Sequence, residues 1–71
     1  MTLREFTGLT LAAKAEELEL WAQPVAEKVV KGYLVQCYRL YDFYVEVYCD
    51  PVQGHPCRYQ AFRGALALTA Y

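Results

Sequence analysis

The chain has 71 residues, a length that supports one domain over residues 1–71 with a single hydrophobic core. Hydrophobic residues make up 56% of it and charged residues 21%, a composition too apolar for a disordered chain. The formal net charge is -1 with dispersed basic residues, and no uncharged stretch approaches the roughly 20 apolar residues of a bilayer-spanning helix, so neither nucleic acid nor a membrane is an expected partner.

Two helix starts are predicted near the N-terminus. Thr2 followed by Glu5 has the capping-box pattern, which predicts a short helical turn. Thr10 is the stronger start, because an apolar stripe with helical spacing follows it. The stripe consists of Leu11, Ala15, Leu18, Ala22 and Val25. Trp21, at its edge, is predicted to pack in or beside the core, with an exposed binding anchor as the alternative.

Pro24 is predicted to end the main helix. It has no N–H to donate and it disfavours helical geometry at the preceding residue, so the helix ends near Ala22 or Gln23. The segment from Val25 to Lys31 is then a connector or a second short turn. Gly32 marks the start of a strand.

Residues 33–49 have the features of a β-hairpin, because β-branched and aromatic residues dominate them. Tyr41 and Asp42 form the turn between Leu40 and Phe43, and Asp42 tolerates the left-handed backbone that such a turn requires. Alternation then defines two faces of the hairpin. The first face carries Leu34, Gln36, Tyr38, Leu40, Phe43, Val45, Val47 and Cys49; the second face carries Tyr33, Val35, Cys37, Arg39, Tyr44, Glu46 and Tyr48.

A third strand, from about Cys57 to Phe62, is predicted to return antiparallel after a turn over residues 50–54 with a glycine bulge at Gly54. In this register Arg58 lies opposite Glu46 on the second face, where the two side chains form an ion pair. The first face then gains Cys57, Tyr59 and Ala61, opposite Val47, Val45 and Phe43.

These elements predict an α+β fold. An N-terminal helix packs on the first face of a three-stranded antiparallel β-meander, with a short C-terminal tail. Leu66, Leu68 and Tyr71 in that tail are expected to lie against the sheet or the helix.

The second face is the predicted functional surface, because one layer of helix covers only one face of a sheet. Tyrosine buries its ring while its hydroxyl tolerates water, a combination enriched at interfaces. The sequence therefore predicts a small non-enzymatic protein that self-associates, as a homodimer, or binds another protein. The predicted interface consists of Tyr33, Val35, Tyr44, Glu46, Tyr48 and Arg58. An exposed tyrosine face without a role and a base-stacking platform are the alternatives, the latter disfavoured by the acidic charge balance.

A small metal- or ligand-binding protein is the alternative from a different class. Cys49, His55 and Cys57 are its candidate ligands, but their spacing is not a recognised zinc pattern and buried thiols are ordinary packing residues. His55 is the sole histidine, and no second polar group is expected to orient it for catalysis. No metal, cofactor or catalytic residue is therefore predicted.

The cysteines, Cys37, Cys49 and Cys57, are odd in number, and the chain does not begin with a basic segment followed by an apolar run. They are expected to be reduced thiols in the cytoplasm. A domain this small then needs another source of stability, and its apolar composition favours oligomerisation.

The order of these elements resembles that of a set of small uncharacterised bacterial proteins, in which a leucine-rich helix precedes a hairpin with an aromatic-valine-glutamate-valine core. The residues that carry the resemblance are Glu5-Phe6, Leu9, Lys14-Ala15, Leu18, Trp21, Tyr38, Leu40, Phe43-Tyr44-Val45-Glu46-Val47, Asp50-Pro51 and Phe62. The chain departs from them at Val52 and His55, where those proteins are more polar. The resemblance implies a single α+β domain and carries no known activity or site.

Overall fold

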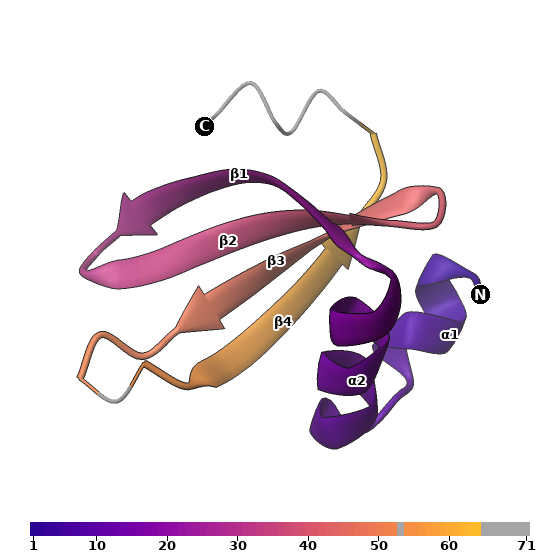
Figure 1. The fold of residues 1–71 in the computed structure, drawn as a ribbon, viewed down its shortest axis with the longest axis horizontal. Coiled ribbons are helices and arrows are strands. Elements are labelled where there is room, and N and C mark those ends of the chain that lie inside the picture. Colours follow the sequence, from indigo (N-terminus) through magenta and orange to yellow (C-terminus); the bar gives the residue numbers. More distant parts are fainter. Residues whose placement is uncertain (53, 65–71) are drawn as a thin grey trace.

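A computed structural model describes residues 1–52 and 54–64 of the chain. The elements in chain order are α1 (Leu3–Thr7), α2 (Leu11–Trp21), β1 (Gln23–Val30), β2 (Tyr33–Leu40), β3 (Phe43–Cys49) and β4 (Pro56–Phe62). The strands form one antiparallel sheet in the order β1-β2-β3-β4 (Figure 1). The α+β class is confirmed, but the described residues form a sheet of four strands, whereas the sequence predicts three.

The additional strand is β1, in the segment for which the sequence predicts a connector or a second short turn. Lys31 and Gly32 have φ angles of 50° and 85°, the left-handed conformation that both central residues of a tight hairpin turn adopt. Pro24 and a bulge between Pro24 and Ala26 are tolerated because β1 is an edge strand. The apolar pair Val29-Val30 and the bulge interrupt the alternation of polar and apolar residues that would indicate this strand. The sequence signal for β1 is instead the Lys31-Gly32 turn that follows it.

Both predicted helix starts are confirmed. In the capping box, the Thr2 backbone N–H donates to Glu5 Oε1 at 2.9 Å and the Glu5 N–H donates to Thr2 Oγ1 at 3.1 Å. Thr10 caps α2 by accepting from the Ala13 N–H at 3.1 Å. The helix ends at Trp21, with Ala22 as its C-cap, as Pro24 requires.

The central hairpin has the predicted register, with Leu40 paired to Phe43, so the division of its side chains into two faces is confirmed. The turn differs in one respect. Positive φ falls on Tyr41, at 56°, and not on Asp42. The Tyr41 ring lies near Phe43, with centroids 6.3 Å apart, and its hydroxyl donates to Glu17 Oε1 at 3.4 Å.

The predicted register of β4 is wrong by two residues. Arg58 lies opposite Tyr48, not opposite Glu46, and Tyr59 lies opposite Val47. Part of the displacement arises at Cys57, which lies at an irregularity in the pairing where its thiol donates to the Tyr48 carbonyl at 3.3 Å. A shift of two residues preserves the face, so Tyr59 and Ala61 still lie on the first face.

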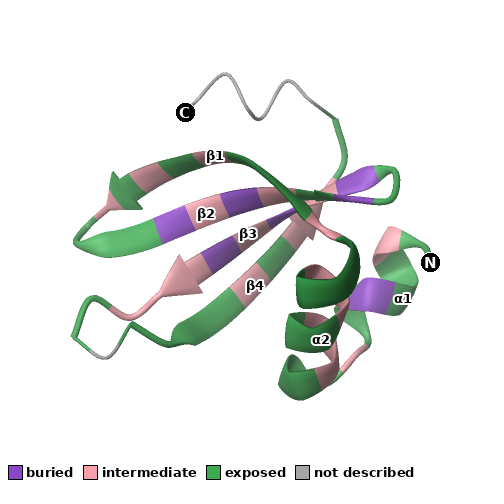
Figure 2. Ribbon diagram, in the orientation of Figure 1, coloured by how far each residue is buried: buried purple, intermediate pink, exposed green. Residues whose placement is uncertain are grey.

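The core lies on the first face under the helices, which occupy the end of the sheet that carries the β2–β3 turn (Figures 1 and 2). Phe6 of α1 is buried there, with its ring 5.8 Å from that of Phe43. Leu18 and Ala22 of α2 pack at the margin, and α2 has no fully buried residue. The buried cluster consists of Phe6, Leu40, Phe43, Val45 and Val47.

Two sequence-based expectations concern other parts of the chain. Leu66, Leu68 and Tyr71 lie outside the described residues. Within residues 1–52 and 54–64, neither helix has the length and apolar character needed to cross a bilayer.

Candidate functional site

The two faces of the sheet extend onto the edge strands by register. β1 adds Ala26, Lys28 and Val30 to the second face and Glu27 and Val29 to the first. β4 adds Arg58, Gln60 and Phe62 to the second face, and Pro56, Tyr59 and Ala61 to the first. Each face offers a distinct surface.

The middle of the second face is closed within the single chain. Val35 and Cys37 on β2 are fully buried, so Val35 is a packed residue and not the surface residue that the sequence suggested. Lys28 and Glu46 lie on the strands either side of β2, and their charged groups meet at 3.8 Å. The partner described for Glu46 is thus Lys28, in place of the predicted Arg58, because the β4 register moves Arg58 beside Tyr48.

One end of the second face is open and hollow. Tyr33 and Tyr48, from strands β2 and β3, meet Arg58 of β4 there, and the guanidinium carbon of Arg58 lies 5.3 Å from the centroid of the Tyr48 ring. This surface, the tyrosine hollow, has a volume of about 490 Å³. Its lining residues are Val30, Lys31, Tyr33, Tyr48, Cys57 and Arg58. Three of the six predicted interface residues therefore come together.

Tyr44, the remaining predicted interface residue, lies toward the other end of the same face. Its ring stacks on that of Phe62, with centroids 5.7 Å apart and an interplanar angle of 21°. Both residues are half-buried. Tyr44 is therefore engaged within the chain and separate from the tyrosine hollow.

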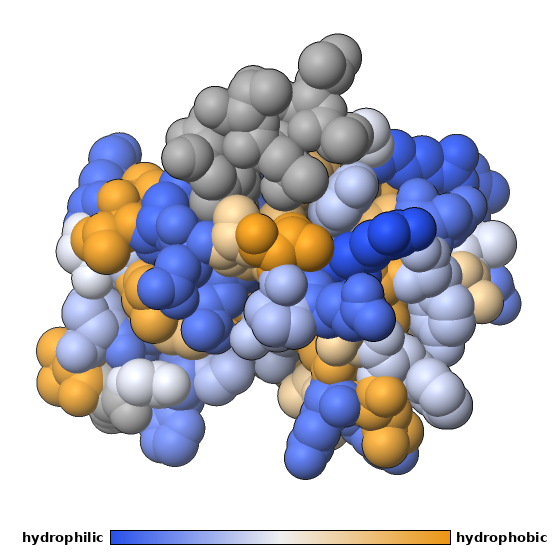
Figure 3. All heavy atoms as spheres, turned by 45° about the horizontal axis from the view of Figure 1, so that its top comes forward, coloured by the Kyte–Doolittle hydropathy of each residue, from blue (hydrophilic) through white to orange (hydrophobic). Residues whose placement is uncertain are grey.

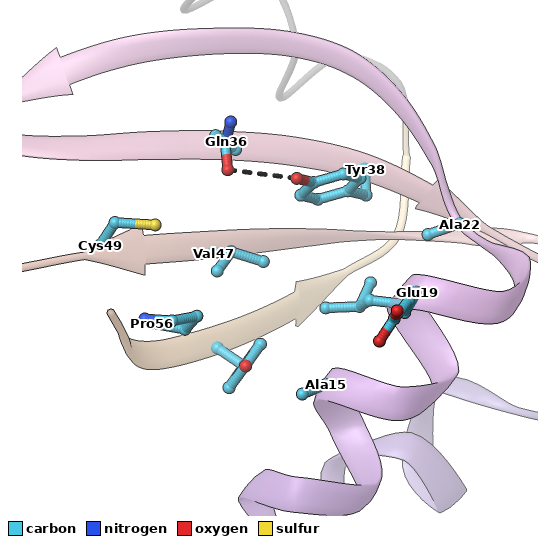
Figure 4. Close-up of a pocket in the computed structure, with 10 residues that line it drawn as sticks. Ala15, Glu19, Ala22, Gln36, Tyr38, Val47, Cys49 and Pro56 are labelled. Atoms are coloured by element: carbon cyan, nitrogen blue, oxygen red, sulfur yellow. Dashed lines mark hydrogen bonds between the residues drawn. The ribbon is translucent and has the colours of Figure 1, made fainter. Parts of the chain in front are cut away.

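On the first face, α2 leaves an open cleft of about 360 Å³ between itself and the sheet (Figure 4). The predicted apolar stripe of the helix forms one wall through Ala15, Leu18 and Ala22, beside Glu19. The sheet forms the floor, with Gln36, Tyr38, Val47, Cys49, Pro56 and Tyr59. Sequence reasoning assigned this whole face to the helix and missed the cleft, because small alanines in the stripe do not fill the space above large strand residues.

The polar groups of the cleft floor are neutral hydrogen-bonding groups. The Tyr38 hydroxyl donates to Gln36 Oε1 at 3.1 Å (Figure 4). Burial raises the pKa of Tyr38, and neighbouring Cys49 and Glu27 raise it further. Burial also raises the pKa of Cys49 and of Tyr59. The phenols and the thiol therefore stay protonated near neutral pH.

An apolar row extends the cleft toward the end of the sheet without helices. Val29, Leu34 and Cys49 are successive cross-strand partners on the first face, and Pro56 pairs with Cys49 on β4. Val29 is 70% exposed and Leu34 37% exposed. These four residues, the apolar row, begin with Cys49 and Pro56 in the cleft and continue to the exposed Leu34 and Val29.

Trp21 is 60% exposed, so the prediction that it packs in or beside the core is wrong. It is the last residue of α2, does not line the cleft, and lines a depression with Gln23, Arg39 and Tyr41. Leu20 beside it is equally exposed.

Figure 3 shows apolar residues on one side of the molecule as separate patches among hydrophilic ones.

The alternative ligand set, Cys49, His55 and Cys57, is not assembled. Cys49 lines the cleft on the first face, whereas Cys57 lines the tyrosine hollow on the second. The described contact of His55 is through its backbone carbonyl, which accepts from the Asp50 N–H at 2.9 Å in the β3–β4 turn. Over residues 1–52 and 54–64, no three His, Cys, Asp or Glu side chains lie close enough together to hold a metal ion.

Comparison with protein-family models, with curated proteins and with solved structures gives no match to this chain. The tyrosine hollow and the cleft are the two surfaces from which a function can be proposed.

Proposed function

We propose that this chain is a non-enzymatic interaction protein that self-associates, as a homodimer, through the tyrosine hollow. The observation that supports this proposal most directly is the convergence of Tyr33, Tyr48 and Arg58 from three different strands on one open surface. Elsewhere on the second face, Val35 and Cys37 are fully buried and Tyr44 stacks on Phe62.

The chemistry of the hollow is that of an interface centre. Tyr33 is 41% exposed and Tyr48 is half-buried, so both rings have apolar area left to bury against a partner. Tyr and Arg are the residue types enriched among those that dominate binding energy, and Arg58 already lies over the Tyr48 ring. One self-complementary patch is sufficient for a two-fold dimer.

Charge gives this proposal a distinctive salt dependence. Lys31 and Arg58 line the hollow, and its described lining includes no acidic side chain. In a two-fold dimer, Lys31 and Arg58 of one copy approach the same cations of the other copy. Added salt screens the repulsion, so the dimer strengthens between low salt and about 0.15 M ionic strength, where the Debye length is about 8 Å.

The test is a size measurement by sedimentation velocity over a wide range of protein concentration. Tyr33→Lys places a third cation in the hollow and should weaken the dimer by about tenfold or more, equivalent to about 1.4 kcal/mol. Tyr41→Lys is the matched control, because Tyr41 is 43% exposed against 41% for Tyr33 and lies outside the hollow. A wild-type chain that stays monomeric at high concentration contradicts the proposal, as does equal weakening by both variants.

A further inference from the structure

Acidic side chains lie on two sides of the cleft in the first face, one in its lining and one on the neighbouring strand β1. Glu19 lines it from α2. Glu27 lies on β1 directly opposite Gln36, which is part of the cleft floor. Both glutamates are exposed, and the described lining includes no Lys or Arg. The cleft therefore combines an uncharged floor of apolar and neutral polar side chains with negative charge on two sides.

The apolar surface is longer than the cleft itself. The apolar row continues from Cys49 in the cleft to the exposed Leu34 and Val29. A small molecule that fills the cleft would leave Leu34 and Val29 of the row in water. A longer polypeptide segment covers both the cleft and these two residues.

From this arrangement we infer that the first face binds an amphipathic basic segment of a different protein. Its apolar side chains enter the cleft between α2 and the sheet, and its Lys or Arg residues lie beside Glu19 and Glu27. A volume of about 360 Å³ accommodates a few side chains but not a whole helix, so the segment docks over the cleft and inserts its anchors.

A second copy of this chain is a poorer occupant because of charge. Among its exposed large apolar residues, the adjacent pair on a helix is Leu20 and Trp21 at the end of α2, which follow Glu16, Glu17 and Glu19. Docking that acidic helix between Glu19 and Glu27 brings like charges together. A segment with Lys or Arg beside its apolar anchors meets the same two glutamates with opposite charge.

The probe for this inference is a short fluorescein-labelled helical peptide of leucine and lysine, with a leucine and glutamate peptide of the same pattern as its counterpart. Anisotropy should show that the Leu/Lys peptide binds and that the Leu/Glu peptide does not. The double variant Glu19→Lys, Glu27→Lys should weaken Leu/Lys binding by about tenfold or more. Glu16→Lys is the matched control, because Glu16 is exposed on the same helix and does not line the cleft; it should change binding by less than about twofold.

Two cysteines report where the peptide binds. Cys49 lies in the cleft and Cys57 in the tyrosine hollow, so bound peptide should slow alkylation of Cys49 and leave Cys57 unchanged. Equal loss of binding in Glu16→Lys, binding of the Leu/Glu peptide, or an unchanged Cys49 rate overturns the inference. A change in the size of the free protein in the double variant also overturns it, because that result makes a second copy the occupant. A failure of the self-association proposal is separate, because it appears without peptide, as a wild-type chain that stays monomeric or as equal weakening by Tyr33→Lys and Tyr41→Lys.

Discussion

Replacing Phe6 by alanine tests how the helices are held on the sheet. Phe6 is the buried residue of α1, it is 1% exposed, and its ring lies 5.8 Å from that of Phe43. The ammonium group of Lys14 on α2 lies 5.9 Å from the centroid of the same ring. One side chain therefore connects α1, α2 and the sheet.

The expected cost is a large fraction of the total stability. Truncating a buried phenylalanine to alanine costs about 3–5 kcal/mol, through lost apolar burial and the cavity that remains. At about 0.05–0.15 kcal/mol per residue, a domain of this length is stable by about 4–10 kcal/mol. Phe6→Ala should therefore leave the domain marginally folded or unfolded, whereas Phe6→Leu, which keeps most of the volume, should cost about 1 kcal/mol.

Urea denaturation followed by circular dichroism measures the free energy of unfolding of each variant. Leu20→Ala is the control, because Leu20 is a large apolar residue that is 60% exposed, and it should change stability by less than about 0.5 kcal/mol. A loss below about 1 kcal/mol in Phe6→Ala would refute the reasoning. It would mean that the sheet is stable without the anchored α1.

Two further predictions concern the first hairpin turn and the thiols. Lys31→Asn should raise the free energy of unfolding by a few tenths of a kcal/mol, because Asn tolerates the φ of 50° better than Lys and precedes Gly32 in the favoured turn pair; a loss of stability in urea denaturation contradicts this. With a small alkylating reagent near neutral pH, exposed Cys57 should react first, Cys49 more slowly because burial raises its pKa, and buried Cys37 only on unfolding. Mass spectrometry of the modified peptides measures this order, and early modification of Cys37 would contradict it.

The elements that the sequence predicted correctly are those with local signals. The helix caps at Thr2 and Thr10 depend on contacts within one turn of helix. The hairpin turn between Leu40 and Phe43 depends on residues that are neighbours in the sequence. The register of β4 failed because it depends on the geometry of the β3–β4 turn. There, a backbone bond from the Gly54 N–H to the Asp50 carbonyl, at 2.7 Å, and the irregularity at Cys57 displace the pairing by two residues.

The candidate site was predictable in composition but not in placement. Tyr33, Tyr48 and Arg58 were predicted to be on one face, and they lie together there. Two features of the site depend on packing between elements that are distant in the sequence. Val35 is fully buried, and an open cleft separates part of α2 from the sheet. Propensity and periodicity describe a single element. They therefore assign a side chain to a face, but they do not predict how closely another element packs on that face.

The charges at the two surfaces make the two proposals separable in one experiment. The tyrosine hollow is lined by Lys31 and Arg58, and the cleft lies between Glu19 and Glu27. Salt therefore strengthens the symmetric dimer, where like charges meet, and weakens the basic peptide complex, where opposite charges meet. A titration of salt with both cysteine reactivities recorded should show Cys57 protection rising while Cys49 protection by the peptide falls. Salt effects of the same sign at both thiols would be inconsistent with two oppositely charged surfaces on opposite faces of one sheet.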